Sequence, residues 1–262
     1  MKLFVSCVSK KHGEIKADVS KIKADNHEDF LKEWLDIREG NTPARDVYKG
    51  AQWEIIKKLE NKAEVYVVSA GYGRLRLDDN ITPYSITFSS AYPENNHLLI
   101  PQFDDLNQKQ TNQRWWGSMV SHDKVDIKYD PNESYVFTTN PCYNSAMAVD
   151  LKLFEGKDNY LKLTDYRLGR LAKWLKTGAN NLNVTFAKWL IENEPNIKTN
   201  TELKILIEDL DKKHGKDLYK KRSKVDDAFI YDWIEQNKTI QQLRDNNYSC
   251  SKQRFNNLKQ LR

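Results

Sequence analysis

The chain has 262 residues, which is enough for one large domain or two domains of ordinary size. Aromatic residues make up 11% and charged residues 30%, a balance that excludes a disordered chain, and the net charge is only +5. Three widely separated cysteines, no signal-peptide pattern and no apolar run near the roughly 20 residues of a membrane span favour a cytoplasmic protein without membrane contact.

Residues 1–155 alternate between strand and helix patterns. Apolar runs typical of buried strands lie at 2–9, 64–70, 84–90 and 133–140. Helical spacing of apolar residues is found at 26–40, 42–61, 111–123 and 141–154. This alternation predicts an α/β domain with a small, mostly parallel sheet and flanking helices.

From residue 156 onward, helical patterns follow one another at 164–178, 184–194, 199–215 and 224–237. The last stretch divides into a short helix at Ile240–Arg244, a polar turn at Asn246–Ser249 and a final helix from about Ser251. That order is typical of a helix-turn-helix. We therefore predict a boundary after residue 155, followed by an all-helical domain that ends in such a unit.

Charge is divided unevenly between these two parts. Residues 156–262 contain 22 Lys and Arg against 14 Asp and Glu, whereas residues 1–155 contain 20 against 23. A basic part can hold a polyanion while the other part acts on it. A solvated helical surface explains the same numbers, so charge alone does not show whether the basic part binds a polyanion.

One candidate site is the stretch VVSAGYGRLRLDDNITPYS, residues 67–85, which runs from a strand into a glycine-rich loop. Gly71 and Gly73 allow a ligand to approach the backbone, but the spacing does not match a P-loop. Tyr72 could stack on a base, worth about 1–3 kcal/mol, and Asp78 could supply a carboxylate. A plain turn with exposed aspartates explains the same residues, and composition alone favours it.

Further candidates lie at the ends of two other strands. Ser6, Cys7 and Lys10 lie at the tip of the first strand, where hydroxyls and backbone amides can hold a phosphate or a base edge. Asn140 and Asn144 carry amides that can read a base, although Asn140 also suits the cap of a helix that begins at Pro141.

The sequence RWWGS, residues 114–118, places two tryptophans side by side on a predicted helix. Adjacent helical residues do not share one face, so Trp115 could line a pocket. Burial of one tryptophan in the core is an equal alternative. The five histidines show no metal-ligand spacing, and we expect neither a metal nor an organic cofactor.

Three of these stretches together resemble a known family. CVSKK, PARDVYKGAQWEIIKKLE and YVVSAGYGRLRLDDNITPYSITF are similar to the YaaA-like and uracil-DNA-glycosylase-like bacterial proteins over roughly residues 1–90. The matching positions are Cys7, Lys10, Lys11, Ala44, Arg45, Asp46, Tyr48, Gly50, Ser69, Ala70, Tyr72, Gly73, Asp78, Ile81, Pro83 and Tyr84. The chain departs from the family where Gly71 replaces a common Lys, where Arg74 replaces a common Leu, and where Val8 is inserted.

The resemblance implies a DNA glycosylase, because members occur in phage defence and one removes glucosylated hydroxymethylcytosine from viral DNA. Such an enzyme flips out its target base and stabilises positive charge on the sugar. In this chain it implies Asp78 and Asn140 as catalytic residues. It implies substrate contacts from Ser6, Cys7, Lys10, Ser69, Gly71, Tyr72, Gly73, Tyr84, Trp115 and Asn144. We expect a monomer that holds double-stranded DNA through Arg74, Arg114, Lys252, Arg254, Asn257 and Lys259.

Two alternatives remain. The first is a DNA-binding protein of the YaaA type without enzymatic activity. The second is a base-exchange or nucleoside-cleaving enzyme that acts on tRNA or free nucleosides, which would not need the basic helical part.

Overall fold

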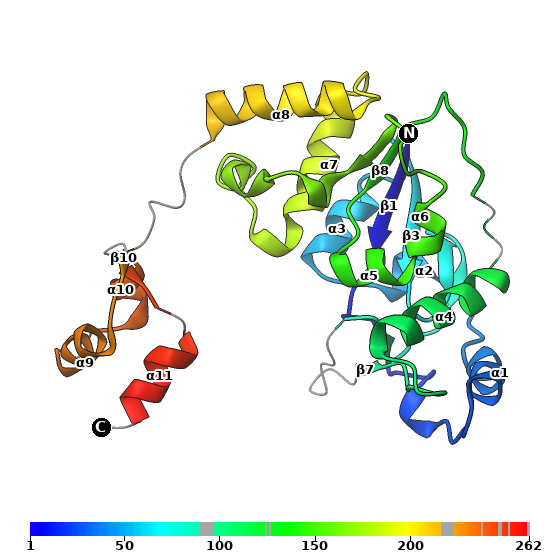
Figure 1. The fold of residues 1–262 in the computed structure, drawn as a ribbon. Coiled ribbons are helices and arrows are strands. Elements are labelled where there is room, and N and C mark those ends of the chain that lie inside the picture. Colours follow the sequence, from blue (N-terminus) through cyan, green and yellow to red (C-terminus); the bar gives the residue numbers. More distant parts are fainter. Residues whose placement is uncertain are drawn as a thin grey trace. The chain divides into compact units, whose positions relative to one another are not determined.

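Figure 1 shows the computed structural model of the protein, which describes residues 1–89, 97–123, 125, 127–215, 223–236, 238–245, 248–250 and 252–260. The chain forms two compact units, Met1–Gly215 and Lys216–Arg262. Each unit has its own apolar core. Within the described ranges, no helix is both long enough and apolar enough to cross a membrane.

The first unit is built on a five-stranded sheet with the strand order β4-β3-β1-β8-β9. Its parallel strands are β1 (Lys2–Ser6), β3 (Glu64–Ser69), β8 (Tyr135–Phe137) and β9 (Tyr160–Lys162). Strand β4 (Gly73–Arg76) runs antiparallel to β3 at one edge. β1 and β3 are buried along nearly their whole length, as expected for strands covered on both faces. The predicted α/β architecture is confirmed.

Helices connect the parallel strands. The β1–β3 connection contains α1 (His27–Ile37), α2 (Ala44–Val47) and α3 (Ala51–Lys57), and the β8–β9 connection contains α5 (Pro141–Ala146) and α6 (Ala148–Leu151). Since β3 and β9 lie on opposite sides of the β1–β8 pair, right-handed crossovers place α3 and α5 on opposite faces. The longer helices α4 (Gln108–Ser121) and α7 (Leu182–Asn193) pack against α5 and α3 respectively (Figure 1).

Several helix starts follow local sequence signals. Asn107 and Gln110 form a capping box, so α4 begins three residues before the expected Thr111. Thr199 caps α8 (Asn200–His214) in the same way. Two short ladders complete the unit: β2 (Thr42–Pro43) pairs with β5 (Asn80–Ile81), and β6 (Ile86–Thr87) pairs with β7 (Leu98–Leu99).

Residues 156–215 belong to the first unit. Tyr160–Lys162 forms β9, which extends the sheet beside β8, so the expectation of an all-helical part from residue 156 is wrong. The helical pattern at 164–178 forms only short turns, the 3-10 helices η3 (Leu163–Asp165) and η4 (Leu168–Leu171). Its apolar residues instead join the main core. The boundary expected after residue 155 therefore falls inside this unit.

The second unit contains β10 (Ser223–Lys224), α9 (Asp227–Glu235), α10 (Ile240–Asp245), β11 (Tyr248–Ser249) and α11 (Lys252–Gln260). Its core includes Ile230 and Ile234 of α9 and Phe255 and Leu258 of α11. The short helix and the final helix occur where they were expected, whereas Asn246 of the expected turn lies outside the described residues. The helix-turn-helix stays a prediction.

Candidate functional site

A pocket of about 470 Å³ opens at the carboxyl end of β1 and β8. The chain leaves β1 toward β3 on one side of the sheet and leaves β8 toward β9 on the other. The position between β1 and β8 is therefore the switch point of the topology, where open α/β sheets place their ligands. The volume lies within the roughly 300–1,000 Å³ of small-molecule sites.

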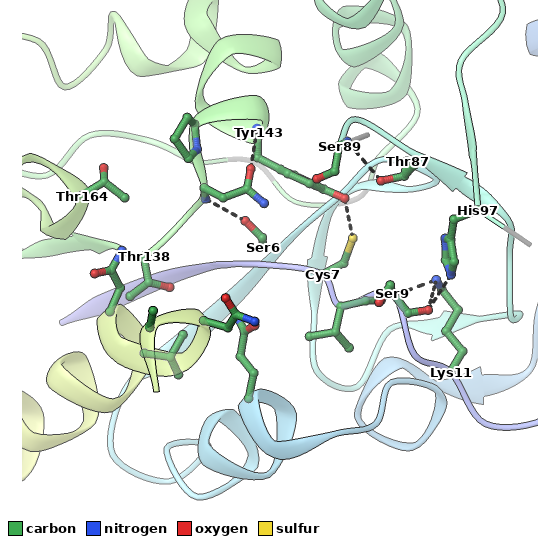
Figure 2. Close-up of a pocket in the computed structure, with 18 of the residues that line it drawn as sticks. Ser6, Cys7, Ser9, Lys11, Thr87, Ser89, His97, Thr138, Tyr143 and Thr164 are labelled. Carbon is green, nitrogen blue, oxygen red and sulfur yellow. Dashed lines mark hydrogen bonds between the residues drawn. The ribbon is translucent and has the colours of Figure 1, made fainter. Parts of the chain in front are cut away.

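Segments distant in sequence form the pocket wall. Ser6 and Cys7 come from the end of β1, and Thr138 and Asn140 from the end of β8 (Figure 2). Further wall residues come from α3 with Gln52, from β6 and the residues beside it, and from the start of α7 with Asn183. Among the described residues that line the pocket, none is an aspartate or a glutamate. Neutral amides and hydroxyls dominate its polar surface.

The two strand ends are joined directly. The backbone NH of Asn140 donates to Ser6 Oγ over 3.1 Å, and Asn140 Oδ1 accepts from the Tyr143 NH over 3.1 Å, which caps α5. Cys7 Sγ and Tyr143 Oη lie 3.0 Å apart in a hydrogen bond (Figure 2). Burial raises the pKa of the Tyr143 hydroxyl well above its usual value, so this group stays protonated.

Lys11 is the only lysine or arginine among the described lining residues, and its side chain is only 7% exposed. Its Nζ lies 3.5 Å and 3.4 Å from the carbonyl oxygens of Val8 and Ser9, and 4.0 Å from the centre of the Tyr84 ring. Burial lowers the pKa of Lys11 to about 8, although the nearby Cys7 acts in the opposite direction.

His97 lies beside Lys11. Its Nε2 is 2.6 Å from the Ser9 carbonyl oxygen, so Nε2 carries the proton and Nδ1 is left as an acceptor (Figure 2). Burial first, and then the charge of Lys11, lowers the pKa of His97 to about 4. The imidazole is therefore neutral near pH 7.

Buried hydroxyls lie behind Lys11. Tyr84 Oη is 2.8 Å from both Tyr48 Oη and Ser69 Oγ, and burial raises the pKa of both tyrosines well above the usual range. This network connects two of the motif stretches, because Tyr48 follows α2 and Tyr84 follows β5. Tyr48 and Tyr84 thus pack behind Lys11 without lining the pocket themselves.

Three of the predicted site residues, Ser6, Cys7 and Asn140, do come together at this pocket. The expected Lys10 is exposed and does not line it; the neighbouring Lys11 does. Asn144 faces an adjacent hollow, where its amide Nδ2 donates to the Thr139 carbonyl over 3.2 Å.

The Gly-Tyr-Gly turn is packed into the core. A Cβ on Gly71 would lie 2.9 Å from the Tyr84 ring, and Gly73 has a φ of +74° that favours glycine. Tyr72 is 7% exposed, and its hydroxyl accepts from the Thr82 NH over 2.9 Å. Trp115 is fully buried and donates to the Ala70 carbonyl over 2.7 Å. Trp115 therefore has no exposed face for stacking on a base, and Tyr72 reaches only a separate hollow that Arg74 and Asp78 also line.

Asp78 lies away from the pocket. Because β4 runs antiparallel to β3, with Gly73 opposite Ser69 and Arg76 opposite Tyr66, the chain leaves β4 at the amino edge of the parallel strands. Asp78 is exposed in the turn that follows, in a separate hollow beside Asp79. The structure therefore does not bring Asp78 together with Asn140.

The predicted DNA contacts are scattered. Arg74 is paired with Asp123 over 2.8 Å, and Arg114 is paired with Glu28 over 2.8 Å. On α11, Arg254 forms an ion pair with Asp227, whereas Asn257 and Lys259 are exposed. The side chain of Lys252 lies outside the described part of the chain.

Sequence reasoning missed several residues that line the pocket, among them Gln52, Lys11, His97, Asn180 and Asn183. Lys11 belongs to the CVSKK motif, but spacing alone could not show whether Lys10 or Lys11 faces the pocket. A backbone bridge from Lys11 to Tyr48 decides that orientation. The two asparagines lie beyond the expected domain boundary. In the ranges described, no group of three or more His, Cys, Asp or Glu residues could hold a metal ion.

Comparison with known proteins gives a weak relationship. No family model matches the chain, and no solved structure matches it. A UPF0246 protein of Ligilactobacillus salivarius (strain UCC118) is 24% identical over 180 residues. The match covers 65% of this chain and 64% of that relative, less than two thirds of its length. This similarity supports the YaaA-like character of the motifs.

Proposed function

We propose that the protein is a DNA glycosylase that binds a flipped, modified base in the pocket between β1 and β8. The observation that carries this proposal is the lining of that pocket. It lies at the switch point of the sheet, and neutral amides and hydroxyls dominate its polar lining. Nucleobase edges present mixed donors and acceptors, which amide side chains can match.

Specific groups are available for a base. Gln52, Asn140 and Asn183 each bring one amide to the wall, and each amide offers donors and an acceptor. Thr164 Oγ1 is buried in the wall with no hydrogen-bond partner in the structure (Figure 2).

The distribution of charge supports DNA as the substrate. Residues 216–262 contain 11 Lys and Arg against six Asp and Glu, which leaves 31 of each in residues 1–215. The second unit therefore carries the whole net charge of +5. A basic unit that contacts phosphates would hold the duplex, while the neutral unit reads one extruded nucleotide.

The pocket also suggests how water could be positioned. Nδ1 of neutral His97 is an acceptor whose basicity, with a pKa of about 4, resembles that of a carboxylate. In a hydrolytic reaction it would orient the water that adds to the sugar carbon C1′. This assignment replaces Asp78, which lies at the other edge of the sheet.

The test is release of a free base. Duplexes that carry uracil, hydroxymethylcytosine or glucosylated hydroxymethylcytosine are incubated with the protein beside a matched unmodified duplex. Abasic sites are cleaved with alkali, and the free base is identified by mass spectrometry. Release from one modified duplex only, with the unmodified duplex intact, supports the proposal. Activity on the glucosylated base would extend it to antiviral defence.

A second candidate function is DNA binding without chemistry. The observation in its favour is the lack of any aspartate or glutamate among the described pocket residues, since glycosidic bond cleavage commonly uses a carboxylate. This function predicts affinity for all of these duplexes and no free base from any of them. The same experiment therefore separates the two functions.

A further inference from the structure

Lys11 has an unusual position for a lysine. Its side chain is almost fully buried at the pocket, and it forms no ion pair with a carboxylate in the part of the chain that the structure describes. Its contacts are two carbonyl oxygens at 3.4 Å and 3.5 Å and the face of the Tyr84 ring. Buried charges are normally paired, because an unpaired one loses its hydration without compensation.

The groups that face Lys11 supply no carboxylate as a counter-ion among the described residues. Tyr48 and Tyr84 keep their protons because burial raises the pKa of both hydroxyls. His97 is neutral because burial and Lys11 lower its pKa to about 4. Cys7, at the end of β1, favours the charged form of Lys11, and its Sγ is hydrogen-bonded to Tyr143 Oη. The described lining of the pocket therefore holds one buried ammonium group and no carboxylate to pair with it.

We propose that Lys11 binds the departing base as an anion, so that the pocket selects heterocycles that leave in anionic form. This inference rests on the proposed glycosylase function. Lys11 lines the pocket, is the one lysine or arginine among its described lining residues and has no carboxylate partner there. An anionic heterocycle would complete the missing pair, and the charged hydrogen bond would strengthen as negative charge develops on the base.

The step balances without a further reactant. The bond between C1′ and the base nitrogen breaks, and its electron pair goes to the nitrogen. Water adds to the cationic C1′ and loses a proton. The base anion accepts a proton and leaves neutral, so that the products are the free base and an abasic site. Lys11 remains an ammonium group throughout and forms no covalent bond.

The direct test measures binding of free heterocycles to the full-length protein. Cytosine, uracil and 6-azauracil increase in N–H acidity in this order. Calorimetry near pH 7.5 should show 6-azauracil binding at least about tenfold more tightly than uracil, the size of one charge-assisted hydrogen bond. In Lys11→Met this preference should disappear, whereas the exposed neighbour variant Lys10→Met should keep it. Failure of 6-azauracil to bind, or unchanged preference in Lys11→Met, overturns the inference.

A kinetic test distinguishes the anion site at Lys11 from the proposed glycosylase function on which it rests. If the wild-type protein releases no base while 6-azauracil binds through Lys11, the glycosylase proposal fails and the anion site stands. If the wild type releases base and Lys11→Met releases it equally fast, the anion site fails and the glycosylase proposal stands. A purely structural Lys11 would lower the thermal stability of Lys11→Met without changing the order of heterocycle preference.

The pH profile gives a second readout. Lys11 must be protonated to bind an anion, and its pKa is about 8 in the free protein. Single-turnover base release at low enzyme concentration should therefore be constant below that pH and fall about tenfold per pH unit above it. Lys11→Arg keeps its charge over this range, so its rate of base release should not fall above pH 8. A wild-type profile that rises above pH 8 contradicts the inference.

Discussion

Two loops that follow neighbouring strands of one sheet have opposite characters. The loop after β1 opens into a polar pocket lined by Ser6, Cys7 and Lys11. The turn after β3 contains the Gly-Tyr-Gly sequence that first indicates a ligand site, yet Gly71 and Tyr72 are buried against aromatic rings. Glycine and tyrosine beside a strand thus indicate close packing as readily as a ligand site. The site itself depends on small polar residues that form no conspicuous motif.

The largest expected effect tests the packed turn. Gly71→Val should lower the free energy of unfolding by about 3 kcal/mol, because its side chain would collide with Tyr84 and Trp34. Urea unfolding followed by tryptophan fluorescence measures this loss. Gly117→Ala is the matched control: a Cβ there meets nothing within 4 Å, so it should be neutral or stabilise by up to about 1 kcal/mol. Equal stability of both variants would show that the turn is loosely packed.

The next effect concerns the two compact units. A chain that ends at Gly215 lacks the unit with the whole net positive charge. It should keep its cooperative unfolding but lose roughly a hundredfold in duplex affinity at low salt, with a shallower dependence on salt concentration. Fluorescence anisotropy with a labelled duplex measures both quantities. Unchanged affinity would favour an enzyme of free nucleosides, one of the alternatives that the sequence left open.

A smaller effect tests the pocket. Asn140→Asp keeps an oxygen that can cap α5, so stability should change by less than about 0.5 kcal/mol. It also introduces a carboxylate into a pocket that has none among its described lining residues, and should slow release of an anionic base at least about tenfold. Single-turnover base release beside urea unfolding separates the two effects. Loss of stability together with activity would reduce Asn140 to its capping role.

The smallest effect is expected at the other edge of the sheet. Asp78→Asn changes an exposed turn residue outside the pocket, so base release should stay within about twofold of wild type. A rate reduction of a hundredfold or more would restore Asp78 as the catalytic carboxylate and move the site to the hollow beside β4.

The sequence predicted the secondary elements better than their assembly. Periodicity and caps located β1, β3, β8 and most helices, because burial on one or both faces imposes a regular spacing. It missed β9, since Tyr160–Lys162 is three residues long and gains its partner only when β8 lies beside it. The boundary expected after residue 155 followed from that omission, because without β9 the later residues have no strand in the sheet.

The candidate site was predictable only in part. Ser6, Cys7 and Asn140 were found because the ends of parallel strands meet at one edge of a sheet. Asn183 could not be found, since it reaches the pocket through the packing of α7 against α3. Asp78 was chosen through the family resemblance, but the direction of β4, which the sequence does not reveal, carries it to the opposite edge.

The measurement that tests the central claim most directly is the identification of free base released from a single modified duplex. Wild-type protein should release the base and leave one abasic site per duplex, and Lys11→Met should bind the same duplex but release the base at least about tenfold more slowly. Binding of every modified duplex by the wild type, with no free base detected from any of them, would contradict the glycosylase account.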